Sequence, residues 1–273
     1  MNICFVGGGN MAKALIGGLL KRGYAPSKIR VVESDEERCI DLHTEFVVRA
    51  TTDISDVIPY SEIILLAVKP QQMQAACRNL APLLTGQMII SIAAGIRAHD
   101  IARWLGTGNI VRAMPNTPAL IRHGVSGLYA LEAVSGADRE KAEAILEAVG
   151  TSMWVEKESL LDSVTAISGS GPAYVFYFIE AMQQAAQELG LDDLQSRQLV
   201  LDTFIGAAKL ADSSQQDIAT LRANVTSKNG TTERALVALD ANRVKQHIVA
   251  AAHAAAARAK EMGDELGKDK DAG

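Results

Sequence analysis

The first 23 residues constrain the fold of this chain most strongly. An apolar run at Ile3–Val6 is typical of a buried strand, three glycines follow, and Met11–Leu19 carries apolar residues at helical spacing. Within this stretch, Gly7-x-Gly9-x-x-Ala12 fits the dinucleotide-binding fingerprint, in which the first glycine permits a tight turn and the second lets the backbone approach a pyrophosphate. Glycine clusters also form ordinary turns, but the strand before and the helix after favour the nucleotide interpretation.

A second strand is predicted at Ile29–Glu33, and it ends on an acidic residue. Glu33 follows Gly9 at close to the ~20-residue spacing at which an acidic residue accepts a hydrogen bond from the ribose 2′-hydroxyl. The same carboxylate would repel the 2′-phosphate of NADP, whereas Ser34 and Arg38 would bind that phosphate if Glu33 points away. The alternative interpretation is a solvated charge at a strand end.

Strands and helices then alternate as far as residue 156, which predicts an α/β Rossmann domain with a doubly wound, mainly parallel sheet. Open sheets of this kind bind ligands at the carboxyl ends of their strands. The corners at Ala67–Pro70, Ala93–Gly95 and Pro115–Pro118, where the apolar runs 63–68, 88–92 and 110–114 end, therefore line the predicted cofactor cleft. The predicted cofactor-binding residues are Val6, Gly7, Gly8, Gly9, Asn10, Met11, Glu33, Ser34, Ala67, Val68, Lys69, Pro70, Ala94 and Asn116.

From Leu160 onward the sequence becomes rich in alanine and leucine, and strand-like runs disappear. We therefore predict two domains, a dinucleotide-binding domain at 1–159 and an all-α domain at 160–273. A turn is predicted at Ser168–Pro172. The helix that follows, Pro172–Met182, is apolar nearly all round, which predicts burial on every side. So large an apolar helical surface indicates that part of it is covered by a second subunit.

Charge and cysteine usage narrow the classes of partner. The net charge is −5 and no dense run of lysine or arginine occurs, which argues against nucleic-acid and membrane-surface partners and favours a small molecule. No apolar stretch is long enough for a membrane span. The three cysteines and five histidines show no metal-binding spacing, so no metal and no disulfide framework is expected. A reducing cytoplasm is the simplest location.

The loop Val225–Thr232 combines hydroxyl side chains with a glycine directly before a predicted helix. N–H and O–H donors at the positive end of a helix dipole form an anion site suited to a carboxylate. An ordinary N-cap turn is the alternative interpretation on local grounds.

Five sequence blocks, in order along nearly the whole chain, resemble those of pyrroline-5-carboxylate reductase. The first block is shared by many dehydrogenases, and the last two are specific to this family. The blocks are Gly7-x-Gly9-Asn10-Met11-Ala12, Ala67–Pro70, Met114–Pro118, Gly169–Tyr174 and Val225–Thr232.

The resemblance implies a Rossmann domain followed by a helical dimerisation domain, and NAD(P)H-dependent reduction of 1-pyrroline-5-carboxylate to L-proline, the last step of proline biosynthesis. It implies NADPH as the cofactor, with NADH as the alternative, and a homodimer that completes the site, with assembly to a decamer left open. Lys228-Asn229 stands where the family commonly has Pro-Gly, and asparagine can adopt the left-handed conformation that glycine would supply. The implied substrate-binding residues are Ser227, Asn229, Gly230, Thr231 and Thr232.

The implied reaction needs few side chains, because a protonated cyclic imine accepts hydride without a strong acid nearby. We expect the Asn116 turn and the Ala94 corner to seat the nicotinamide, and Thr232 to approach the imine nitrogen as the catalytic residue. A β-hydroxyacid dehydrogenase is the alternative enzyme, but it needs a lysine one helical turn after a glycine pair, and none follows Gly171 before residue 178. A non-enzymatic NAD(P)-sensing module is the other alternative, and it leaves the donor loop unexplained.

Overall fold

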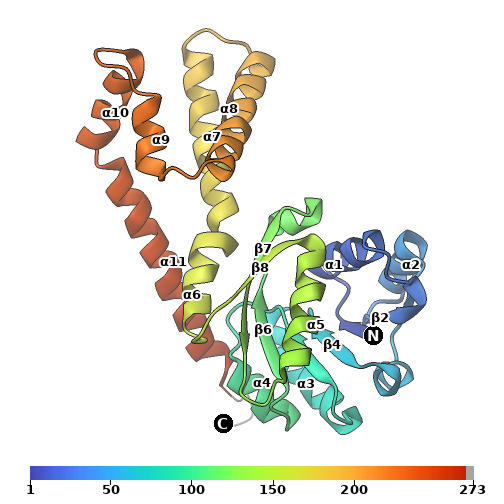
Figure 1. Ribbon diagram of the computed structural model, residues 1–273. Coiled ribbons are helices and arrows are strands. Elements are labelled where there is room, and N and C mark those ends of the chain that lie inside the picture. Colours follow the sequence, from blue (N-terminus) through green and yellow to red (C-terminus); the bar gives the residue numbers. More distant parts are fainter. Residues whose placement is uncertain (269–273) are drawn as a thin grey trace. The chain divides into compact units, whose positions relative to one another are not determined.

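The computed structural model describes residues 1–268, which form two compact units (Figure 1). One unit comprises Met1–Ser170 together with the chain from Ala254 onward, and the other comprises Gly171–His253. The predicted domain boundary between residues 159 and 160 stays a prediction. The contacts divide this structure eleven residues further on and place the end of the last helix in the first unit.

An eight-stranded sheet forms the centre of the first unit, in the order β3-β2-β1-β4-β5-β6-β7-β8. All neighbouring strands are parallel except β6 and β7, which confirms the mainly parallel, doubly wound sheet. The strands are β1 (Ile3–Val6), β2 (Ile29–Val32), β3 (Arg49–Thr51), β4 (Ile63–Leu66), β5 (Met88–Ser91), β6 (Ile110–Met114), β7 (Gly124–Ala130) and β8 (Gly150–Trp154).

Helices cover both faces of this sheet, and each face has its own apolar core. Leu15 and Leu19 of α1 pack in one core with residues of α2 and α5, whereas Met73 of α3 and Ile101 of α4 pack in the other. Each helix buries the apolar face that its 3.6-residue period creates. These helices are α1 (Asn10–Lys21), α2 (Glu36–Phe46), α3 (Met73–Leu80), α4 (Ala98–Leu105) and α5 (Gly136–Leu146). Short 3-10 turns lie at Pro26–Lys28, Ile54–Asp56, Ile58–Tyr60, Pro70–Gln72, Ala81–Leu83, Thr117–Ile121 and Glu147–Val149.

The register of three central strands places the predicted cofactor residues at one edge. Val6 of β1 is paired with Val32 of β2 and with Leu66 of β4, so these strands end at the same level. The residue after each end continues the pairing: the Gly7 amide donates to the Val32 carbonyl at 2.8 Å, and the Ala67 amide donates to the Val6 carbonyl at 2.8 Å. The glycine turn therefore lies directly beside the corner that follows β4.

The turn predicted at Ser168–Pro172 is wrong, because the chain there remains helical. Helix α6 (Leu160–Val164) continues through a π-helical turn, Thr165–Gly169, into α7 (Gly171–Glu188). Ser168 satisfies its hydroxyl inside the helix by donating to the Val164 carbonyl at 2.9 Å. Pro172 has no N–H for the carbonyl four residues earlier, and that carbonyl, of Ser168, accepts instead from Nδ2 of Asn116 at 3.1 Å.

The second unit consists of helices, as predicted. It contains α7, α8 (Asp193–Ser213), α9 (Ile218–Asn224), α10 (Thr231–Ala241) and the start of α11 (Val244–Leu266). A capping box begins α8, where the Asp192 carboxylate accepts from the Gln195 amide and the Gln195 side chain accepts from the Asp192 amide. None of the helices within residues 1–268 is long and apolar enough to cross a membrane.

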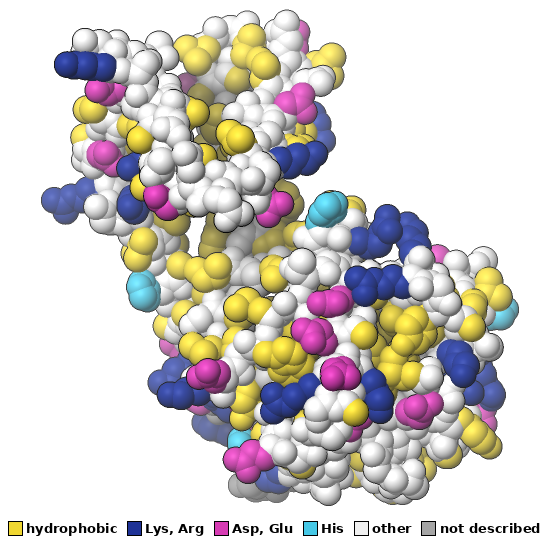
Figure 2. Space-filling model, in the orientation of Figure 1, with side chains coloured by type: hydrophobic (Ala, Val, Ile, Leu, Met, Phe, Trp, Pro, Cys, Tyr) yellow, Lys and Arg dark blue, Asp and Glu magenta, His cyan; other side chains and the backbone are white. Residues whose placement is uncertain are grey.

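The burial on every side that was predicted for α7 is not provided by this chain's own residues. No residue of α7 is buried, and Phe176 and Tyr177 are 65% and 70% exposed. Hydrophobic side chains are spread over the visible surface of this unit (Figure 2). Cover of this apolar helix by a second subunit stays a prediction.

A candidate dinucleotide site and a separate donor loop

Gly7 forms a turn that only glycine allows. Its φ is +101°, and an added Cβ would lie 2.9 Å from both the carbonyl carbon and the oxygen of Ala67. A side chain here would strain the backbone and collide with the corner after β4. The tight turn predicted from the fingerprint is therefore present, closely packed against Ala67 and Val68.

Gly9 differs from Gly7, because it faces open space. It is the N-cap of α1 with φ −69°, and a Cβ at this position would meet no protein atom within 4 Å. No side chain caps α1, so the first N–H groups of the helix remain available to a ligand. Asn10 is exposed, and Met11 is partly exposed beside it. An anionic diphosphate fits this arrangement of open backbone at a positive helix end.

The carboxylate of Glu33 is turned toward the glycine turn. Glu33 is only 8% exposed, and its Oε2 accepts from the Gly8 amide at 2.9 Å. Its Oε1 accepts from the amide and the hydroxyl of Ser34 at 2.9 and 3.2 Å. The alternative interpretation of Glu33 as a solvated charge is wrong, because the loop amides draw the carboxylate inward. Arg38 pairs with Asp35 at 3.6 Å.

The remaining predicted cofactor residues occupy three corners of the same sheet edge. Lys69 is exposed before the short 3-10 turn that starts at Pro70, and Ala94 lies in the corner between β5 and α4. Asn116 is buried, and both ends of its amide are used within the protein: Nδ2 donates to Ser168, and Oδ1 accepts from the Val125 amide at 2.9 Å. Contact between Asn116 and a cofactor stays a prediction.

The donor loop in the helical unit has the left-handed residue that its sequence requires. Asn229 has a φ of +61°, and its amide donates to Oε2 of Glu233 at 2.7 Å. Gly230 is the N-cap of α10, and a Cβ there would lie 2.5 Å from Oγ of Ser227. No side chain caps α10, so the amides of its first turn, at Thr231 and Thr232, face a potential ligand without an intrahelical partner.

Sequence reasoning missed Glu233, which fixes the loop by accepting from the Asn229 amide. The available signal was its position three residues after the N-cap, where a glutamate commonly bonds back to the backbone before the helix. The capping-box rule alone did not predict that Glu233 would accept from the Asn229 amide. The rule includes a hydrogen-bonding side chain at the N-cap, and the N-cap here is Gly230.

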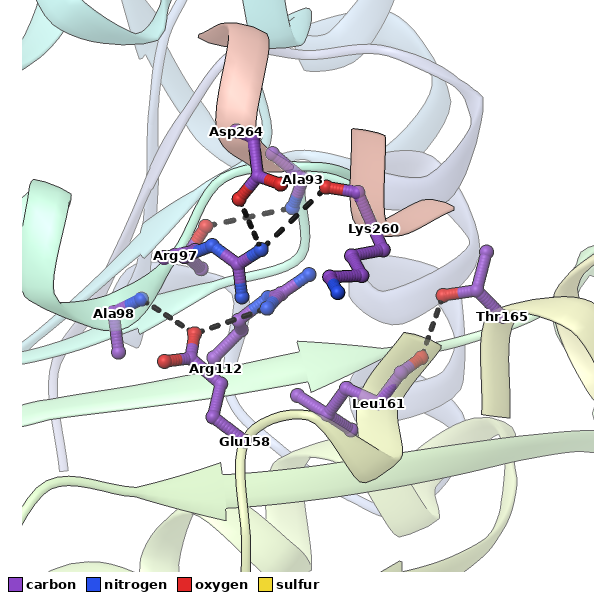
Figure 3. A network of polar contacts seen from close by, with 10 residues as sticks. Ala93, Arg97, Ala98, Arg112, Glu158, Leu161, Thr165, Lys260 and Asp264 are labelled. Carbon is purple, nitrogen blue, oxygen red and sulfur yellow. Dashed lines mark hydrogen bonds and ion pairs between the residues drawn. The ribbon is translucent and has the colours of Figure 1, made fainter. Parts of the chain in front are cut away.

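A buried polar network was also missed (Figure 3). Nη1 of Arg112 on β6 lies 2.9 Å from Oε1 of Glu158, and the same oxygen accepts from the Ala98 amide at the start of α4 at 2.6 Å. Burial raises the pKa of the neighbouring Asp162, while the charge of Arg112 opposes that shift. This network supports the sheet edge next to the predicted site.

Two of the three cysteines are buried and unreactive. Burial raises the pKa of both Cys4 and Cys77 to about 12, so each stays a neutral thiol near neutral pH. Among residues 1–268 no group of three or more histidine, cysteine or acidic side chains is placed to hold a metal ion.

The fold and the open glycine turn define a Rossmann-type oxidoreductase with an added helical domain. The family model described as NADP oxidoreductase coenzyme F420-dependent matches residues 2–95, and the one described as pyrroline-5-carboxylate reductase dimerisation matches residues 158–262. Pyrroline-5-carboxylate reductase from Pseudomonas aeruginosa is 43% identical and covers 97% of this chain and 98% of its own. The chain belongs to the pyrroline-5-carboxylate reductase family.

Solved structures agree with this membership over nearly the whole length. A pyrroline-5-carboxylate reductase from Coxiella burnetii has a TM-score of 0.90 at 40% identity, covering 96% of this chain and 98% of its own. Plasmodium falciparum pyrroline carboxylate reductase with NADP bound has a TM-score of 0.87 at 29% identity, with the same coverage. Family membership excludes the β-hydroxyacid dehydrogenase and the NAD(P)-sensing module as interpretations.

Proposed function

We propose that this chain reduces 1-pyrroline-5-carboxylate to L-proline with NAD(P)H, as the last step of proline biosynthesis. The observation that carries this proposal is a pair of uncapped helix starts, at Gly9 and at Gly230, each preceded by the loop that the family motif predicts. One start suits the diphosphate of a dinucleotide, and the other suits a substrate carboxylate. Each is built from glycine, where a side chain would obstruct the backbone donors or collide with the loop.

The reaction depends on positioning more than on strong acids or bases. When bound, the reduced nicotinamide would supply a hydride to the carbon of the protonated imine. The C=N π electrons then become the lone pair of a neutral ring amine, which takes a proton from water to give the ammonium form of proline. The amides of Thr231 and Thr232 and the hydroxyls of Ser227, Thr231 and Thr232 hold the carboxylate. Asn229 and Gly230 shape this loop around the carboxylate, because their own amides donate to Glu233 and to the Ser227 carbonyl. Thr232, which is partly buried, directs its hydroxyl toward the ring nitrogen.

The role of Thr232 is tested by Thr232→Ala, with Thr232→Ser as the variant that keeps the hydroxyl. We expect kcat/KM for pyrroline-5-carboxylate to fall about tenfold or more in the alanine variant, as for one lost transition-state hydrogen bond, and to recover in the serine variant. Thr203→Ala is the matched control, because the Thr203 hydroxyl donates to Leu199 inside α8. Unchanged turnover and substrate KM in Thr232→Ala would refute the role.

The overall function is tested by following oxidation of NADPH and of NADH with pyrroline-5-carboxylate as substrate. Turnover with at least one cofactor is expected from the folded protein. Absence of turnover with both cofactors would reject the proposed reaction, whatever the outcome for Thr232.

We propose NADPH as the cofactor, with NADH as the alternative that Glu33 favours. In its present position the carboxylate opposes a 2′-phosphate, and the NADP-bound Plasmodium falciparum relative supports use of NADP in this family. Glu33→Gln should raise the ratio of kcat/KM for NADPH over NADH about tenfold, since it removes the charge and keeps an oxygen for the Gly8 amide. Exposed Glu36→Gln is the control, and an unchanged ratio in Glu33→Gln would remove Glu33 from the 2′ position.

A homodimer is the proposed assembly, because the helical part matches the dimerisation model of the family and α7 exposes Phe176 and Tyr177. Assembly of such dimers into a decamer is a separate proposal, which the mass of the complex in solution tests. The cytoplasm is the proposed location, supported by three free cysteines, Cys4, Cys39 and Cys77.

A further inference from the structure

The last turns of α11 lie directly against the corner between β5 and α4. This corner, Ala93–Arg97, contains Ala94, which is predicted to seat the nicotinamide. Gly95 in its centre is buried with a φ of +70°, and an added Cβ would lie 2.9 Å from Cβ of Met262 and 3.3 Å from Cδ1 of Leu266. The backbone of the corner therefore has no room to move toward α11.

Arg97 joins the same corner to α11 by a second contact. Its Nη2 donates to Oδ1 of Asp264 at 2.7 Å and to the Lys260 carbonyl at 3.5 Å (Figure 3). The guanidinium lies on Gly263, where an added Cβ would be 3.0 Å from Nη2. The absence of a side chain at 263 lets the planar group rest on the helix surface and reach its two acceptors.

The other end of the corner is also held. Ala98, the residue after Arg97, donates its amide to the buried Glu158–Arg112 pair. Contacts from two distant parts of the sequence thus meet at one short loop: residues 260–266 from α11 and residue 158 before α6. These contacts with other segments hold the backbone of the corner, because Ala94 and Gly95 have almost no side-chain atoms of their own that could hold it.

We propose that Arg97, through its pair with Asp264, is a positioning residue for the nicotinamide end of the cofactor. The inference rests on the proposed function and on the prediction from the sequence that the Ala94 corner seats the nicotinamide. Arg97 does not touch reacting atoms; it holds the Ala93–Gly95 backbone against α11 so that the ring binds in one orientation. The pair itself is partly exposed, with side chains 28% and 61% accessible, so its loss alters the corner far more than it alters global stability.

The test separates the two ends of the dinucleotide. Binding of the reduced cofactor that the wild type prefers is compared with binding of a fragment that has no nicotinamide. This fragment is ADP-ribose if NADH is preferred, and the 2′-phosphate of ADP-ribose if NADPH is preferred. In Asp264→Ala and Arg97→Ala we expect the Kd for the whole cofactor to rise about tenfold and kcat to fall about tenfold, with the Kd for the nicotinamide-free ligand unchanged. Asp264→Glu and Arg97→Lys should recover part of both losses.

Glu265→Gln is the matched control on the same helix, because Glu265 pairs with Arg258 on an exposed face and does not contact the corner. Equal weakening of both ligands, or no weakening of either, would overturn the proposal. If the wild type binds the cofactor but does not reduce pyrroline-5-carboxylate, the proposed reaction fails while the comparison of the two ligands still tests Arg97. Thermal unfolding of each variant confirms that a binding loss does not come from unfolded protein.

Discussion

Removal of the Glu158 charge should destabilise the protein, because it leaves an arginine charged and buried. The side chain of Arg112 is only 4% exposed and that of Glu158 is 12% exposed, with 2.9 Å between Nη1 and Oε1. The same oxygen accepts the first amide of α4, at Ala98. Glu158→Gln keeps an oxygen for both donors and removes only the charge, whereas Glu158→Ala removes the acceptor as well.

The expected magnitude follows from this burial. Loss of one partner from a buried ion pair costs about 3–5 kcal/mol, whereas an exposed pair contributes about 0.2–1 kcal/mol. Asp162 lies near enough to interact with the Arg112 charge and compensates for part of the loss, so we expect about 3 kcal/mol for Glu158→Gln. Glu158→Ala should cost ~1 kcal/mol more, because the start of α4 loses its acceptor.

Urea unfolding followed by circular dichroism measures this difference as a lower midpoint at an unchanged slope. Glu265→Gln is the control, because the Arg258–Glu265 pair is exposed on both sides, and its unfolding midpoint should stay near that of the wild type. If Glu158→Gln is no less stable than Glu265→Gln, the buried pair does not hold the sheet edge and the reasoning is refuted.

Two further predictions concern the glycine turn and a buried carboxyl. Gly9→Val should leave the unfolding midpoint near that of the wild type, because the position faces open space, and should raise the KM for NAD(P)H at least about tenfold. Gly136→Val is the control, because position 136 also faces open space but lies away from the sheet edge, and it should change neither quantity. Burial raises the pKa of Asp162 above 3.8, so ionisation destabilises the native state progressively as pH rises through the folded pKa. Asp162→Asn should therefore raise the thermal midpoint at pH 7 by more than at pH 4.5; an equal or larger gain at pH 4.5 would contradict this sign.

Local sequence patterns were sufficient for much of the first unit. The apolar runs at β1 and β4 predict strands covered on both faces, and glycine at position 7 predicts a conformation closed to other residues, so the strand, turn and helix order follows from nearby residues alone. Strand β3 was missed because Arg49–Thr51 is short, partly polar and at the sheet edge. The helical continuation from α6 into α7 was missed because the Ser168–Pro172 sequence also favours an ordinary turn.

The contacts that shape the site came only from the tertiary structure. Arg97 and Asp264 are far apart in the sequence, as are Arg112 and Glu158, and no periodicity indicates which charge meets which. Glu33 was predicted at the right strand end, but the direction of its carboxylate depended on the Gly8 amide across the turn.

For helix α7, too, the sequence and the tertiary structure determined different properties. Its apolar composition determined that it needs cover, whereas the folded chain shows that this cover is not supplied by its own residues. The sequence alone thus determined the local conformations, because backbone sterics and apolar periodicity act over a few residues. It also determined the family, through the motif blocks along the chain. The tertiary structure decided the partners of the charged groups, because they depend on where distant segments meet.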